Sequence, residues 1–253
     1  MNRSKKLSVN KLYGKRKFIT ALTAIFGVIV AVIILLTYYG QNVGSFTVKL
    51  EDELYQRNIY ISTDKDFETN KTARLEADSL KDAEKTTLTR INQTICKNTV
   101  GTCVGNKSSY LSYTFYLKNE GTETLDITET LKITKVKDNL DECSWVWYFE
   151  EDMLDENVVK EDEGTVYRKK DTNGPVNLNL DQDYPDQTEF INQDTVFNKD
   201  VKGVKPGEVK KITVITWIDA NDKDAQNFKG NGAIRYTLTF SLYKEDDNRW
   251  EEN

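Results

Sequence analysis

The longest hydrophobic run of the chain covers residues 18–39 and contains no charged side chain. A helix of that length spans roughly 33 Å, which is enough to cross the ~30 Å hydrocarbon core of a bilayer. Because the charged residues before it are all basic, the positive-inside rule predicts a cytoplasmic N-terminus and an external remainder. These basic residues are Arg3, Lys5, Lys6, Lys11, Lys15, Arg16 and Lys17.

Beyond this run, apolar and polar residues alternate in several short segments. Ile234, Tyr236 and Leu238, for example, alternate with polar neighbours, which is typical of a half-buried strand. The segment WVWYF at 145–149 is apolar at every position and predicts a central strand that is buried on both faces. Strands are predicted over residues 44–50, 59–61, 110–117, 125–133, 145–149, 209–218 and 234–242.

Two turns are marked by their residue types. The sequence KPGE at 205–208 fits a type II turn, since proline presets φ and glycine takes the positive φ that follows. Asn119 and Gly121 favour a tight hairpin after the strand at 110–117. Strands at intervals with little helical periodicity predict an all-β fold with a single β-sandwich. The two turns and the strand after the second also resemble those of immunoglobulin-like surface modules.

These patterns predict three parts of the chain. Residues 1–17 form a basic cytoplasmic tail, residues 18–39 a transmembrane signal-anchor helix, and residues 40–253 an extracellular β-sandwich domain. A cleaved signal peptide is the competing interpretation, with residues 43–45 as its best small-residue cleavage site. The run exceeds the roughly 7–15 apolar residues of a signal peptide, which favours a single-pass protein of the cell membrane with the lipid bilayer as a partner.

The predicted extracellular part is acidic. After residue 39 the chain holds 28 basic and 41 acidic residues, a net charge of −13, which argues against nucleic acid as a partner. The chain has no histidine, which excludes a Ser-His-Asp triad and histidine-based zinc sites. We therefore expect no enzyme. The alternative is a surface hydrolase using a bound cation or carboxylates such as Glu150, Glu151 and Asp152.

A loop rich in side-chain oxygen atoms follows the strand at 209–218. Asp219, Asp222 and Asp224 are ligands of the kind that Ca²⁺ prefers, and Asn221 lies among them. The spacing differs from that of an EF-hand, because Lys223 occupies a ligand position. Two interpretations stay open: a calcium site in a protein otherwise without a cofactor, and a solvated loop between strands.

Three cysteines are compatible with export from the cytoplasm. Cys96 and Cys103 flank a short turn-prone segment, and a disulfide between them would close a small loop in an oxidising compartment. Cys143 is left over by this pairing. Other pairings and three free thiols remain alternatives.

The C-terminal part of the chain resembles the closing segment of the TasA/camelysin family. The resemblance lies in residues 217–219, 224–231 and 236–240, and the strand and turn at 113–121 look like an earlier part of that family. It implies a jelly-roll-like β-sandwich exported by Gram-positive bacteria. Some members are biofilm-matrix fibre subunits, and camelysin has been classed as a metalloprotease, a role that the absence of histidine argues against here.

Together these observations predict a membrane-anchored cell-surface β-sandwich with a structural, adhesive or matrix-associated role. The alternative is a cleaved and secreted TasA-like matrix subunit, which would assemble by strand exchange at an exposed sheet edge. Self-association or a partner in the cell envelope or matrix is expected in both cases.

Overall fold

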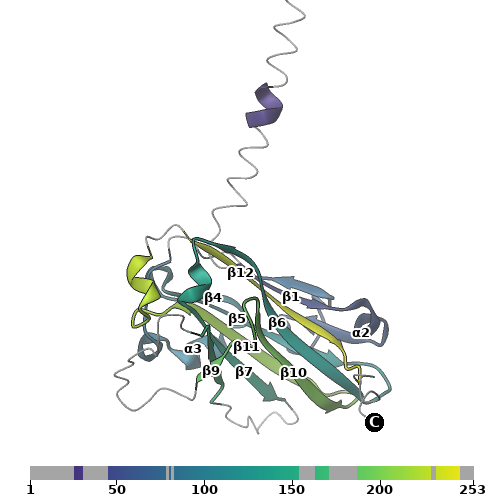
Figure 1. Cartoon of the computed structure of the whole chain (residues 1–253). Coiled ribbons are helices and arrows are strands. Elements are labelled where there is room, and N and C mark those ends of the chain that lie inside the picture. The colour runs from purple at the N-terminus through teal and green to yellow at the C-terminus, as the bar shows by residue number, and fades with distance from the viewer. Residues whose placement is uncertain are drawn as a thin grey trace, which may run out of the picture. The chain divides into compact units, whose positions relative to one another are not determined.

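The predicted strands pair into two sheets in the computed structural model of the chain (Figure 1). The structure describes residues 26–30, 45–77, 80, 83–153, 163–170, 187–228 and 232–245. The chain divides into two compact units, Met1–Gln41 and Asn42–Asn253.

The first unit contains the hydrophobic run. Its described residues, 26–30, are helical and exposed. Within the described ranges, no helix combines the length and the apolar content needed to cross a membrane. The other residues of the 18–39 run lie outside those ranges, as do residues 43 and 44 of the proposed cleavage site, and the membrane anchor stays a prediction.

The second unit holds both sheets. The five-stranded sheet has the order β10 (Thr195–Val204), β6 (Leu125–Lys137), β12 (Ala233–Leu242), β1 (Ser45–Leu50), β3 (Arg74–Glu76). The second sheet has the order β2 (Ile59–Ser62), β5 (Tyr110–Asn119), β11 (Val209–Ile218), β7 (Ser144–Asp152), β8 (Thr165–Arg168), β9 (Gln187–Glu189), and β4 (Gly101–Val104) also pairs with β5. Between strands lie α2 (Asp52–Gln56), α3 (Gln93–Asn98) and the 3-10 turns η1 (Leu88–Arg90), η2 (Asn106–Ser108), η3 (Leu140–Glu142) and η4 (Asp224–Asn227).

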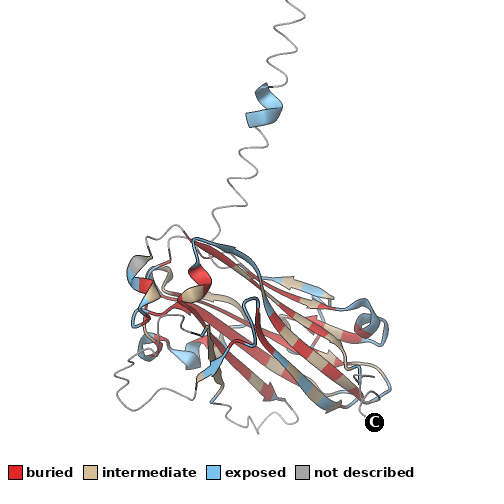
Figure 2. Cartoon of the chain, in the orientation of Figure 1, coloured by how far each residue is buried: buried red, intermediate tan, exposed pale blue. Residues whose placement is uncertain are grey.

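The main core lies between the two sheets. Alternation along each strand directs one face inward, and Figure 2 shows buried residues alternating with partly buried ones along the strands. Tyr236, Leu238 and Phe240 of β12 are buried in this core together with Phe46 and Phe115. The prediction of an all-β fold with two packed sheets is therefore confirmed.

The strand β7 is buried on both faces, as its apolar sequence predicts. Val146 and Tyr148 belong to the core between the sheets. Trp145, Trp147 and Phe149 belong to a second apolar cluster that also includes residues of β11, β8 and α3. Because β7 pairs with β11 on one side and β8 on the other, it has the predicted central position.

One turn prediction is confirmed and one is wrong. Gly207 has φ +82°, as a type II turn requires. The hairpin predicted at Asn119 does not form, because β5 and β6 belong to different sheets. The Asn119 amide instead donates to the carbonyls of Glu123 at 2.8 Å and Val204 at 2.9 Å, and its oxygen accepts from the N–H of Gly121 at 2.9 Å. Asn119 thus acts through its side chain, holding a connection that passes from one sheet to the other.

Candidate functional site

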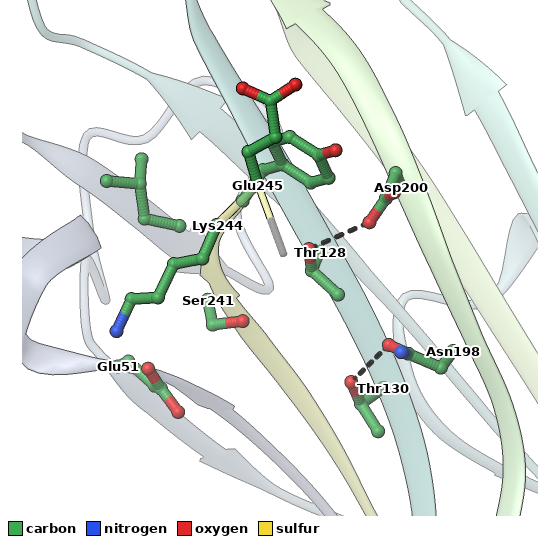
Figure 3. A pocket seen from close by; sticks show the side chains of 10 residues that line it. Glu51, Thr128, Thr130, Asn198, Asp200, Ser241, Lys244 and Glu245 are labelled. Carbon is green, nitrogen blue, oxygen red and sulfur yellow. Dashed lines mark hydrogen bonds between the residues drawn. The ribbon is translucent and has the colours of Figure 1, made fainter. Parts of the chain in front are cut away.

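A polar groove lies on the outer face of the five-stranded sheet, over β12, β6 and β10 (Figure 3). It encloses about 680 Å³, within the range of roughly 300–1,000 Å³ that is typical of ligand pockets. The lining residues are Glu51, Thr128, Thr130, Asn198, Asp200, Ser241, Leu242, Tyr243, Lys244 and Glu245.

The groove forms because short side chains point outward from neighbouring strands. In β6, Thr128 and Thr130 alternate with buried residues. The strand register sets Thr128 beside Ser241 of β12 and Asp200 of β10, and Thr130 beside Asn198 of β10. Small hydroxyl side chains in the centre leave open the space that longer side chains would fill.

Two hydrogen bonds between strands fix the side of the groove formed by β10. Thr128 Oγ1 donates to Asp200 Oδ1 at 2.8 Å, and Thr130 Oγ1 donates to Asn198 Oδ1 at 2.9 Å (Figure 3). Among the described residues, none donates to Asp200 Oδ2 and none accepts from Asn198 Nδ2. One acceptor and one donor are thus held in place and remain available to a ligand.

An aromatic side chain lies at the end of β12. Tyr243 lines the groove, and its backbone N–H donates to the carbonyl of Asp126 at 2.9 Å. The ammonium group of Lys202 lies over its ring, which is a cation–π contact. The backbone of Tyr243 is therefore held by β6, and its ring contacts Lys202 of β10.

The charged residues of the groove are mainly acidic. Figure 3 shows Asp200 on one side of the groove and Glu51 and Lys244 on the other. Glu245 is the third carboxylate among the lining residues that the structure describes, and Lys244 is the only basic residue among these. The groove is therefore negative, and it favours a neutral or positively charged ligand over an anion.

A buried acid lies behind the groove. Glu129 points to the opposite face of β6 from Thr128 and Thr130 and is 1% exposed. Tyr148 Oη donates to Glu129 Oε2 at 2.6 Å, and Lys199 Nζ lies 3.1 Å from the same oxygen. Burial, opposed by the attraction of Lys199, raises the pKa of Glu129 from 4.5 to about 7. This carboxyl group therefore binds its proton up to neutral pH.

The acids at 150–152 form ion pairs. Glu151 is buried and the side chain of Glu150 is mostly so, whereas Asp152 is about half-exposed. None of the three lines the groove. The pairs are Glu150 with Lys199 and Lys210, Glu151 with Lys97 and Lys211, and Asp152 with Lys210. Such compensation is typical of a structural ion network, and the hydrolase hypothesis gains no support from it.

In the predicted calcium loop, two carboxylates accept hydrogen bonds from tryptophan side chains. Trp217 Nε1 donates to Asp219 Oδ2 at 2.8 Å, and Trp145 Nε1 donates to Asp222 Oδ2 at 2.9 Å. The other oxygens of these two carboxylates accept backbone N–H groups at 2.9 Å, including that of Asp224. In the described part of the chain, no group of three acidic, cysteine or histidine side chains is placed to hold a metal ion. Calcium stays a prediction, whereas Asp219 and Asp222 satisfy buried indole donors.

All three cysteines are free thiols in the structure. Cys96 of α3 and Cys143 are buried, and Cys103 of β4 is partly exposed. Burial raises the pKa of the Cys143 thiol to about 12 and also raises that of Cys96. Buried, protonated thiols react slowly, and the Cys96–Cys103 disulfide stays a prediction.

Comparison with protein-family models, with curated proteins and with solved structures finds no match to this chain. The candidate site therefore depends on the geometry of the groove and of the groups behind it.

The sequence patterns did not single out the groove residues. Their signal is the polar half of the alternation: Thr128 and Thr130 in β6 and Ser241 in β12. Asn198 and Asp200 reach the groove only because β10 pairs with β6. The two side-chain hydrogen bonds between these strands join residues that are 68 and 72 positions apart in the sequence. The spacing of residues within a short stretch of sequence does not predict that pairing.

Proposed function

We propose that the chain is a membrane-anchored cell-surface protein whose extracellular β-sandwich has a structural or adhesive role, without catalysis. The observation that carries this proposal is the uncharged run at 18–39, which lies between a purely basic segment and a long segment of net charge −13. That asymmetry is the pattern of a single-pass protein with its N-terminus in the cytoplasm.

The open groove supports a binding role. Its polar lining offers hydrogen-bonding groups on a rigid sheet, and side chains on regular strands are positioned more firmly than those on loops. Two deeply buried acids, Glu129 and Glu151, are engaged by lysine side chains and lie outside the groove. This separation supports adhesion rather than hydrolysis.

Protease treatment of intact cells tests the proposal. A chain with an epitope tag at each end should lose the C-terminal tag to an external protease and keep the N-terminal tag, as a cytoplasmic control protein keeps its own. Retention of the C-terminal tag until the cells are lysed would contradict the proposed topology.

A second candidate is the cleaved matrix subunit of the TasA/camelysin type, with a jelly-roll-like sandwich. The observation that favours it is the position of β1, which starts at Ser45, six positions after the hydrophobic run, and lies between β12 and β3. It pairs with β12 in parallel and buries Phe46, Val48 and Leu50. A terminal strand of this kind suits exchange between copies of a chain. This candidate requires a shortened chain in the medium that sediments as an oligomer.

A further inference from the structure

The groove has the chemistry to recognise a ligand rich in hydroxyl groups. Thr128 and Thr130 offer hydroxyl oxygens that accept, because their hydrogens are donated to Asp200 and Asn198. Ser241 offers a further hydroxyl, Asp200 a free acceptor oxygen and Asn198 amide donors. A ligand that presents both donors and acceptors along its length satisfies this mixture, whereas a mainly apolar ligand would leave the polar lining unpaired.

The charge of the groove further limits the class of ligand that it can bind. In the described part of the lining, the three carboxylates of Glu51, Asp200 and Glu245 outnumber the ammonium group of Lys244. An anionic polymer would meet like charge here, which opposes binding. Tyr243 adds a phenol at the end of the groove, where its hydroxyl and the part of the ring that Lys202 leaves uncovered suit the mixed C–H and O–H surface of a sugar.

The position of the groove fits a chain rather than a single small molecule. Among the described strands, β10 is the edge of the sheet and pairs only with β6. No described strand therefore closes the groove beyond Asn198 and Asp200, which leaves room for a polymer longer than the groove to continue past them.

We infer that this groove binds a neutral or amino-sugar glycan chain, with Asp200 and Asn198 as its main hydrogen-bonding residues. The inference rests on the proposed function, because a surface adhesin meets such polymers in the cell envelope or matrix. The proposed function leaves the ligand open, and this inference adds the class of ligand that the groove binds. The Thr128 and Thr130 hydroxyls hold the two side chains in position.

Titration calorimetry on the full chain in detergent micelles tests the inference. The probes are four soluble hexasaccharides: a glucose oligomer, an N-acetylglucosamine oligomer, its deacetylated cationic form, and an oligomer that contains uronic acids. We expect binding to at least one of the first three and none to the fourth. The double variant Asn198→Ala/Asp200→Ala should weaken that binding about tenfold or more, since it removes a hydrogen bond to a charged group and a second, neutral one.

Thr134→Ala is the matched control, because Thr134 is an exposed residue of the same strand β6 that does not line the groove. It should bind as the unchanged chain does, and melting curves should show that both variants are folded. Absence of binding to all three probes, preference for the anionic probe, or equal binding by the folded double variant would overturn the inference. None of these results depends on cellular topology, so a glycan-binding chain that proves to be cytoplasmic would refute the proposed function alone.

Discussion

Replacing Glu129 by glutamine should flatten the dependence of stability on pH. The carboxyl group is 1% exposed, and burial raises its pKa from 4.5 to about 7 despite the attraction of Lys199. Between these two pH values the folded chain holds a proton that the unfolded chain has released. The stabilisation is thus fully present below pH 4.5 and is lost as the pH rises through about 7.

The size of the effect follows from the pKa difference. A rise from 4.5 to about 7 corresponds to roughly 3 kcal/mol of unfolding free energy. Glutamine retains an oxygen that accepts the hydrogen bond from Tyr148 and removes the titration. Titratable groups that do not interact with Glu129 are present in both proteins, so their contributions cancel in the difference.

Urea unfolding at pH 4.5, 6, 7 and 8 measures this difference, with residues 42–253 as the compact unit. Relative to Glu129→Gln, the unchanged protein should lose roughly 3 kcal/mol across the series. Glu53→Gln, which changes an exposed side chain, is the control and should follow the unchanged protein. Parallel profiles for the unchanged protein and Glu129→Gln would refute the assignment of a protonated Glu129 beside Tyr148 and Lys199.

Four further outcomes are expected. Asp222→Ala should lower the unfolding free energy by about 1–3 kcal/mol in urea titrations, because the buried Trp145 N–H loses its acceptor, and Asp222→Asn should cost less. Asn119→Ala should lower it by about 2 kcal/mol or more in the same assay, since two carbonyl groups lose their donor. Gly207→Ala should cost about 1–2 kcal/mol, measured by thermal melting, because φ is +82°. Calcium or a chelator should leave the melting temperature unchanged, given that Asp219 and Asp222 already hold indole N–H groups; a calcium-dependent rise would establish the ion site.

Local alternation was sufficient to predict most strands. The inward residues of β12 and the doubly buried β7 follow directly from residues 234–242 and 145–149, because a period of two and a fully apolar run each have one simple burial pattern. The type II turn at Gly207 follows from residue chemistry in the same way.

Pairing between distant strands was not predictable from such patterns. Asn119 and Gly121 have the residue types of a hairpin, yet β5 continues into a strand of the other sheet. The neighbours of Glu129 were not predictable for the same reason. The alternation places Glu129 on the inward face of its strand, but only tertiary packing brings Tyr148 and Lys199 to it. Prediction of the groove would have required both the register of the strands and their order in the sheet.

The mass of the intact chain extracted from the membrane fraction of the native cells tests the central claim most directly. The account predicts a mass that includes residues 18–39, still attached to the β-sandwich. A mature form that lacks about the first 40 residues, recovered from the medium instead of the membrane, would contradict the anchor and favour the secreted matrix subunit.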